Sequence, residues 1–155
     1  MERRQFLVSS SSVTGLTLAA VSGLVPARAQ NAPGWNKAAF DSRTFADAAR
    51  ALGASSAPTE SKELVFLAPE IAENGNVVRL SAQSKLPNTT LIAFIVEKNP
   101  NALAAAFDIP PGSDAQVATN IKMAQTSSVY ALARAGDKFF YALREVKVTL
   151  GGCGG

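Results

Sequence analysis

Apolar residues recur with a helical period in one short segment of the chain. Four of them stand at positions i, i+3, i+4 and i+7, on one face of a helix: Phe45, Ala48, Ala49 and Leu52. Thr44 can cap the first turn, with Asp47 where a capping box usually has Glu or Gln. Gly53 is suited to end the helix. We therefore predict a short helix that packs against the body of the domain.

Beyond this helix, short runs of β-branched and aromatic residues alternate with turn residues. Seven such runs predict strands, over 63–69, 76–83, 89–98, 102–109, 116–125, 128–135 and 138–150. Turn sequences such as Asn-Gly, Pro-Asn and Pro-Pro-Gly separate them. Strands that recur about every 8–12 residues are typical of β-sandwiches. The pattern predicts an all-β fold, an immunoglobulin-like antiparallel β-sandwich of about seven strands with a short N-terminal helix.

The run 102–109 has the alanine content of a helix. Pro100 before it and Pro110 after it leave too little room for one, so we interpret the run as a strand. Tyr130 and Tyr141 lie on the last two predicted strands, where packing against neighbouring side chains is the default role of an aromatic residue. The domain thus has the pattern of a scaffold.

The first 29 residues have the layout of an export signal. Arg3 and Arg4 precede a mildly apolar stretch at 6–25, and residues 27–29 form an A-x-A cleavage pattern. The low hydrophobicity of the stretch suits the twin-arginine pathway better than the general one. A membrane anchor is the alternative, but no run of about 18 uninterrupted apolar residues is present. We expect cleavage after Ala29 and export of the folded protein to the periplasm.

These features divide the chain into three parts. Residues 1–29 are the signal peptide, 30–150 are the β-sandwich domain with its helix, and 151–155 are a flexible Gly-Gly-Cys-Gly-Gly arm. Removal of the signal leaves 12 basic and 11 acidic residues, so the formal net charge falls from +3 to +1. The mature chain has no basic stripe with interleaved aromatic residues and no basic amphipathic helix. Neither nucleic acid nor a membrane surface is therefore an expected partner.

The composition also narrows the possible chemistry. The chain has no histidine, which removes Ser-His and Cys-His nucleophile pairs and most zinc sites. Glu70 and Glu73 are two carboxylates near a turn, but a divalent cation needs more oxygen ligands than this segment offers. We interpret both as solvated turn residues. No cofactor and no metal site is predicted.

The single cysteine, Cys153, lies third from the C-terminus in the sequence VTLGGCGG. Four glycines frame it: Gly151, Gly152, Gly154 and Gly155. Because glycine adopts almost any φ and ψ, this segment predicts a thin, flexible arm that can enter a narrow channel of another protein. The fully extended reach from Leu150 to Cys153 is on the order of 10 Å.

The sequence around Cys153 is expected to leave the thiol accessible but contains no group that favours the thiolate. No cation lies close to it in the sequence, and the C-terminal carboxylate two residues later opposes thiolate formation. In an oxidising periplasm an unpaired cysteine is expected to be either buried or deliberately reactive, and the glycines cannot bury it. This combination is typical of a carrier whose chemistry is performed by other proteins, not of an enzyme.

Two segments carry a resemblance to a known family. VTLGGCGG at the C-terminus and APEIAENGNVV at 68–78 are similar to the SoxY family, the sulfur-carrier subunits of the periplasmic Sox system for thiosulfate oxidation. The resemblance covers essentially the whole mature chain. It implies that Cys153 carries sulfur intermediates as covalent adducts on a swinging arm, first as an S-thiosulfonate and then as a persulfide.

The resemblance also implies partner proteins. SoxZ would form a heterodimer with this chain and would share its export signal. The cytochrome SoxAX would couple thiosulfate to Cys153, and the manganese-dependent hydrolase SoxB would release sulfate. The sulfane dehydrogenase SoxCD, where present, would oxidise the remaining outer sulfur.

Two other classes of protein are open alternatives. Ubiquitin-like sulfur carriers also end in Gly-Gly, but their C-terminal carboxylate is activated in the cytoplasm, which the export signal contradicts. A periplasmic interaction domain with a disordered tail would leave Cys153 without a role. A lone cysteine in a symmetric glycine frame makes the carrier the favoured interpretation.

Overall fold

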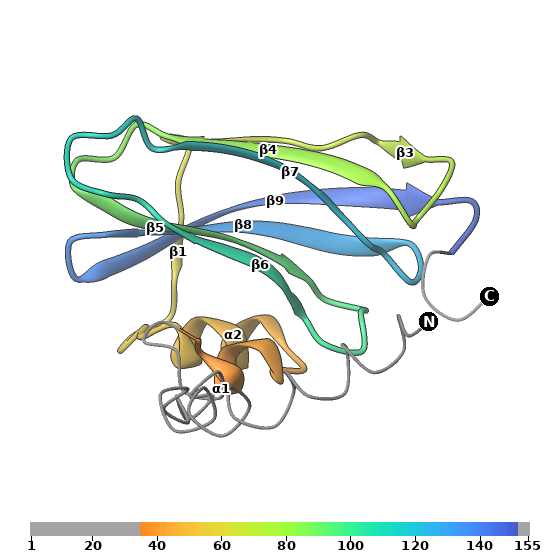
Figure 1. Ribbon diagram of the computed structural model, residues 1–155, viewed down its shortest axis with the longest axis horizontal. Helices are drawn as coiled ribbons and strands as arrows, with labels where there is room; N and C mark the ends of the chain where they lie inside the picture. Colours follow the sequence, from red (N-terminus) through yellow and green to blue (C-terminus); the bar gives the residue numbers. More distant parts are fainter. Residues whose placement is uncertain (1–34, 152–155) are drawn as a thin grey trace, which may run out of the picture. The chain divides into compact units, whose positions relative to one another are not determined.

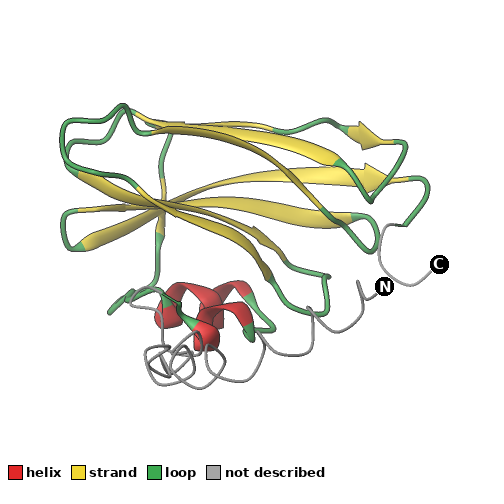
Figure 2. Cartoon of the chain, in the orientation of Figure 1, coloured by secondary structure: helices red, strands yellow, loops and turns green. Residues whose placement is uncertain are grey.

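The computed structural model of the protein describes residues 35–151, which form two short helices followed by nine strands. Two sheets stack face to face, and the helices lie against the outer face of the larger sheet (Figure 1, Figure 2). The predicted all-β sandwich with a short helix at its N-terminal side is confirmed.

Helix α2, Phe45–Ala51, begins where the sequence predicts. The Thr44 hydroxyl accepts a hydrogen bond from the Asp47 backbone N–H over 3.1 Å and donates one to the Asp47 carboxylate over 2.7 Å. The side chain of Asp47 therefore bonds the capping hydroxyl itself, a local variant of the capping box.

The C-terminal end of α2 also follows the prediction. Gly53 has φ +106°, in the left-handed region that favours glycine. Its N–H donates to the Arg50 carbonyl, and the Ala54 N–H donates to the Ala49 carbonyl, both over 2.9 Å. This pair of hydrogen bonds is a Schellman motif, which satisfies carbonyls that the helix itself leaves unpaired.

Helix α1, Lys37–Phe40, is not predicted from the sequence. A single turn is too short to show a helical period. Asn36 caps it by accepting a hydrogen bond from the Ala39 N–H over 3.0 Å, and its amide donates to the Ala51 carbonyl of α2 over 2.7 Å. One side chain thus starts α1 and ties it to α2.

The larger sheet has the strand order β1-β9-β8-β5-β6, with β3 also paired to β9. Its strands are β1 Thr59–Glu60, β3 Ile71–Ala72, β5 Thr89–Val96, β6 Leu103–Asp108, β8 Ser127–Ala135 and β9 Lys138–Val148. The smaller sheet has the order β2-β4-β7. Its strands are β2 Leu64–Leu67, β4 Val78–Ser84 and β7 Gln116–Ile121.

Seven of these nine strands correspond to the seven predicted runs, including β6 in the alanine-rich run. The other two, β1 and β3, have two residues each and are too short to show an alternating pattern. Both pair in parallel with β9, Thr59 opposite Phe140 and Ile71 opposite Lys147. Between β1 and β3 the chain crosses to the smaller sheet, where it forms β2. Strand β9 therefore pairs with β1 near its start and with β3 near its end.

Strand β5 explains how the two layers share a core. Its sequence, TTLIAFIV, is an almost continuous apolar run because both of its faces are covered. Ile92, Phe94 and Val96 point between the sheets, where the Phe94 ring lies 5.9 Å from that of Phe66. Alternate residues of β5 point to the other side, against the cluster beneath the helices: Leu91, Ala93 and Ile95.

Candidate functional site

The structure describes one of the predicted arm residues, Gly151. The thiol residue Cys153 and the other arm glycines, Gly152, Gly154 and Gly155, lie outside the described residues, as do the export residues Arg3 and Arg4. The predictions for those positions stay predictions. What the structure does describe is the root of the arm, Thr149–Gly151, and the loops that hold it.

On one side the arm root is held by the turn that follows β3. The Thr149 N–H donates to the Ala72 carbonyl over 3.1 Å, and the Thr149 hydroxyl donates to the Glu73 carbonyl over 3.0 Å. Two residues earlier in the chain, the Lys147 N–H donates to the Glu70 carbonyl over 3.0 Å. The pairing between β3 and β9 therefore continues past the end of β9 and fixes the backbone as far as Thr149.

Gly75 connects this turn to the arm root and to a second loop. Its N–H donates to the Leu150 carbonyl, and its carbonyl accepts from the Met123 N–H, both over 2.7 Å. Gly75 is itself buried. Because backbone groups that are removed from water need partners, these two bonds bring residues 75, 123 and 150 together.

The second loop, residues 122–126, lies on the other side of the root. The pattern predicts a strand through residue 125, whereas β7 ends at Ile121. Asn99 holds the loop, because its side-chain carbonyl accepts from the Ala124 N–H over 2.9 Å and its amide donates to the Lys122 carbonyl over 2.8 Å. The Thr126 hydroxyl accepts from the Val148 N–H over 2.9 Å. Backbone groups that a longer β7 would pair with a neighbouring strand are thus bonded to Asn99.

Gly151 passes directly beside this loop. A Cβ atom placed on Gly151 would lie 2.5 Å from the Ala124 carbonyl oxygen, closer than real Cβ contacts come. The first glycine of the arm is therefore required by a close approach between two backbone segments, in addition to any freedom that it gives the arm.

We expect the Gly151→Ala substitution to push residue 151 away from Ala124 and to weaken the adjacent Gly75–Leu150 hydrogen bond. The amide hydrogen of Gly75 should then exchange faster with solvent than in the unmodified protein, as followed by NMR. The free energy of unfolding should fall by about 0.5–1.5 kcal/mol, the usual net contribution of one hydrogen bond. Gly154→Ala is the matched control, and equal protection of Gly75 in both variants would contradict the close approach.

The sequence gives little sign of these holding residues. Glu70 and Glu73 are predicted as solvated turn residues, and both are exposed in the structure. Their backbone carbonyls, however, accept the bonds that position β9 and Thr149. The signal that points to this turn is the segment 68–78, which also carries the family resemblance.

Other parts of the described chain offer no competing chemistry. Within residues 35–151 no group of three or more Cys, Asp or Glu side chains is placed to hold a metal ion. Neither α1 nor α2 is long and apolar enough to cross a membrane.

A hollow of about 460 Å³ lies between α2 and the larger sheet, beside Phe45, Tyr130 and Tyr141. The Phe45 ring stacks on Tyr130 with 4.3 Å between ring centroids and meets the edge of Tyr141 at 5.5 Å. Burial raises the pKa of Tyr130, and the Glu97 carboxylate acts in the same direction. The aromatic contacts of Tyr130 and Tyr141 confirm their predicted packing role.

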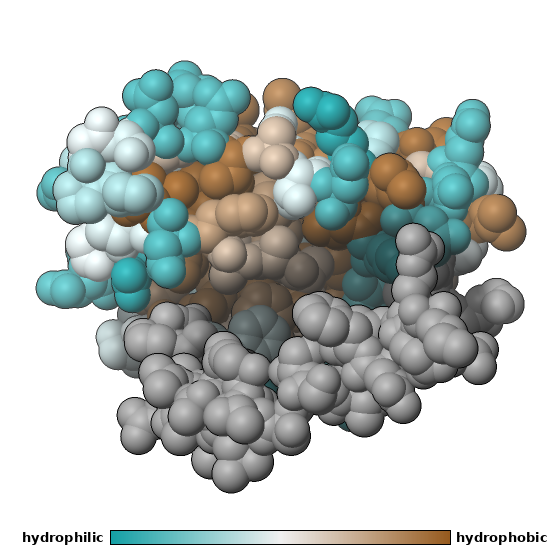
Figure 3. Space-filling model, in the orientation of Figure 1, coloured by the Kyte–Doolittle hydropathy of each residue, from teal (hydrophilic) through white to brown (hydrophobic). Residues whose placement is uncertain are grey.

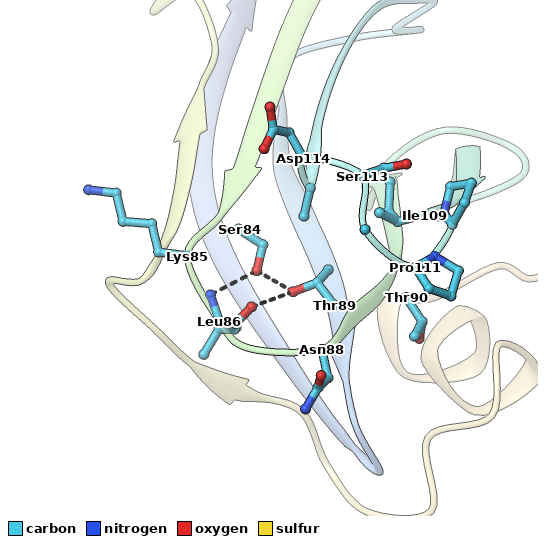
Figure 4. Close-up of a pocket in the computed structure, with 13 residues that line it drawn as sticks. Ser84, Lys85, Leu86, Asn88, Thr89, Thr90, Ile109, Pro111, Ser113 and Asp114 are labelled. Carbon is cyan, nitrogen blue, oxygen red and sulfur yellow. Dashed lines mark hydrogen bonds between the residues drawn. The ribbon is translucent and has the colours of Figure 1, made fainter.

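A second hollow, of about 400 Å³, opens at the end of the sandwich away from residue 151, between 84–90 and 109–115 (Figure 4). The Ser84 and Thr89 hydroxyl oxygens lie 2.7 Å apart, and the Thr89 hydroxyl donates to the Leu86 carbonyl over 3.0 Å. These polar groups bond one another, while the Lys85 side chain extends away from them. The hollow is the space between these two segments, and we assign it no chemistry.

Two comparisons with known proteins identify the same family. The protein-family model described as "Sulfur oxidation protein SoxY" matches residues 48–153. The structure of the sulfur carrier protein SoxY from Chlorobium limicola f thiosulfatophilum is 36% identical, with a TM-score of 0.59 over 68% of this chain and 96% of that one.

A superoxide reductase (neelaredoxin) from Ignicoccus hospitalis is 17% identical, with a TM-score of 0.49 over 64% of this chain and 86% of that one. A search of curated proteins found no match.

Proposed function

Because this chain belongs to the SoxY family of sulfur oxidation proteins, we propose that Cys153 is the thiol on which it carries sulfur-oxidation intermediates. The role of a sulfur carrier follows from the family. The assignment to Cys153 is supported by one observation above all: the family match ends on this residue, the single cysteine of the chain. The sulfur chemistry then belongs to enzymes that the carrier visits, and the chain itself supplies the thiol and the arm.

The first step that we propose is an oxidative coupling. The Cys153 thiol and the outer sulfur of thiosulfate form an S–S bond, the thiol proton leaves, and two electrons pass to a c-type cytochrome. The product is a cysteine S-thiosulfonate with one negative charge. Because no basic residue lies close to Cys153 in the sequence, we assign deprotonation of the thiol to the partner's active site.

The following steps return the thiol. Hydrolysis of the S–SO₃ bond by one water molecule releases sulfate and two protons and leaves the persulfide anion. Oxidation of the outer sulfur takes three water molecules, releases six electrons and six protons from the persulfide anion, and gives a cysteine S-sulfonate. A second hydrolysis then releases sulfate and regenerates Cys153.

The same proposal includes the partners and the location. SoxZ is the proposed stable partner, and SoxAX, SoxB and SoxCD are the proposed enzymes of coupling, hydrolysis and sulfane oxidation. Arg3 and Arg4 are proposed to direct export to the periplasm through the twin-arginine pathway, with cleavage after Ala29. A location in the periplasm fits a carrier that passes electrons to a c-type cytochrome.

The intact mass of the protein tests this proposal. The mature chain is purified without reductant from the periplasm of thiosulfate-exposed cells, and its mass is measured before and after reduction. We expect a reductant-labile increase that matches sulfur or thiosulfate and maps to Cys153, with an N-terminus at residue 30. A bare thiol in both samples, in cells with active partner enzymes, would favour an interaction domain with a disordered tail.

A further inference from the structure

The turn between β3 and β4 contains the sequence Asn74-Gly75, which occurs once in the chain. Asparagine is among the residues that degrade spontaneously in proteins. The backbone nitrogen of the next residue can attack the side-chain amide carbon, and a glycine in that position hinders the attack least because it has no Cβ. The proposed sulfur chemistry makes no use of this pair, so its reactivity is a separate property of the turn.

The attacking nitrogen is held in the folded chain. The Gly75 N–H donates to the Leu150 carbonyl of the arm root over 2.7 Å, and Gly75 is buried. Attack requires that the nitrogen first lose its proton, which a buried and hydrogen-bonded N–H does only when the bond opens. The arm root therefore withholds the Gly75 nitrogen from the side chain of Asn74.

The side chain that would be attacked is open to water. Asn74 is exposed, and its side-chain oxygen accepts a hydrogen bond from the Asn76 N–H over 2.9 Å. Hydrophilic residues also reach the surface at the end of the sandwich where β3 lies (Figure 3). The amide and the water needed for reaction are thus accessible, and opening of the Gly75–Leu150 bond is the step that limits it.

We propose that Asn74 is a deamidation site that becomes reactive whenever the arm root separates from the 73–77 turn. In the first step the Gly75 nitrogen forms a bond to the side-chain carbon of Asn74. The C–N bond of the side-chain amide breaks, and ammonia leaves with the proton from Gly75. In the second step one water molecule opens the cyclic imide to aspartate or isoaspartate and one proton is released, with no transfer of electrons.

This modification makes the opening of the arm root permanent in its isoaspartate form. Isoaspartate runs the backbone through the former side chain and lengthens it by one methylene group, which displaces the Gly75 N–H from the Leu150 carbonyl. Either product places a new carboxylate beside Glu73. The chain without residues 1–29 then has 12 acidic residues against its 12 basic ones, so its formal net charge falls from +1 to zero.

Hydrogen exchange tests the proposal on the unmodified protein. The full mature chain, in the form in which it is purified, is incubated in mildly alkaline buffer, and deamidation of Asn74 is followed by peptide mapping and mass spectrometry. Exchange of the Gly75 amide hydrogen is measured by NMR, and the chain unfolded in urea gives the reference rate for both reactions. Because both need the Gly75 nitrogen to be free, we expect folding to slow them by factors that agree within about one order of magnitude.

Two results would overturn the proposal. One is deamidation of Asn74 as fast in the folded chain as in the unfolded chain, which would mean that the arm root gives no protection. The other is rapid exchange of the Gly75 amide without deamidation of Asn74, which would mean that opening of this bond does not make the site reactive. Asn74→Ser keeps an oxygen for the Asn76 N–H and should remove the acidic product, which assigns that product to Asn74.

The Gly151→Ala variant gives an independent comparison. A Cβ atom on residue 151 would lie 2.5 Å from the Ala124 carbonyl oxygen, so the substitution displaces the arm root. We expect Asn74 to deamidate about 2–10-fold faster in this variant, as for the weakening of one hydrogen bond. Gly154→Ala is the matched control and should deamidate at the rate of the unmodified protein. Equal rates in the two variants would contradict protection by the arm root.

Discussion

Replacing Cys153 by serine will abolish thiosulfate-dependent turnover in a reconstituted system. A serine hydroxyl has no sulfur with which to form the S–S bond, so neither the S-thiosulfonate nor the persulfide can exist on the arm. The variant should show no sulfate production above the level measured without carrier. Oxygen consumption or cytochrome reduction gives an independent reading of the same loss.

The fold should be unaffected by this change. Cys153 follows the last described residue by two positions, and the two core clusters contain only residues within 39–148. Denaturation curves of Cys153→Ser and the unmodified protein should therefore coincide. Gly155→Ser is the matched control, because it adds the same hydroxyl to the arm and keeps the thiol. Undiminished turnover in Cys153→Ser would exclude the carrier role of this residue.

Phe94→Ala will lower the free energy of unfolding by about 3–5 kcal/mol, the usual cost of removing a buried phenylalanine ring. Phe94 has no exposed surface and lies on β5, an interior strand of the larger sheet between β8 and β6. Its ring stands 5.9 Å from Phe66 of the smaller sheet and 6.4 Å from Phe107 of β6. The substitution leaves a cavity where both sheets meet, which the rigid strands cannot collapse to fill.

Urea denaturation measures the loss for Phe94→Ala, with Leu143→Ala as an exposed control that should change stability by less than about 1 kcal/mol. Under the proposed function, the folded fraction of Phe94→Ala should still support sulfate production at the normal rate in a reconstituted system, because Phe94 lies in the core and Cys153 lies beyond it in the sequence. A loss below about 1 kcal/mol would mean that the two sheets are not packed as described.

The parts of the fold that the sequence predicts are those whose signals are local. The seven longer strands each show their own apolar pattern, and α2 shows its period, its cap at Thr44 and its stop at Gly53. Helix α1 and strands β1 and β3 are too short to show a period. They form because of distant partners: Asn36 bonds Ala51, and both short strands add to β9.

The candidate site also has one part that the sequence predicts and another part that it does not. Cys153 and its glycine frame are visible in the sequence because their composition is unusual. The arm root depends on bonds between residues far apart, such as Gly75 with Leu150 and Asn99 with Ala124. Most of these bonds use backbone groups, which every residue has, and no side-chain pattern identifies them.

The contact between Gly151 and Ala124 also tells a protein engineer where the arm can be lengthened. Extra residues placed between Leu150 and Gly151 would put a residue with a Cβ, or a displaced backbone, beside the Ala124 carbonyl. Extra glycines placed after Gly151 leave that contact and the Gly75–Leu150 bond in place. Under the proposed function, a series of carriers with one, two or three added glycines at this second position would measure the depth of the partner's channel, because each added glycine would move the Cys153 thiol farther from the sandwich.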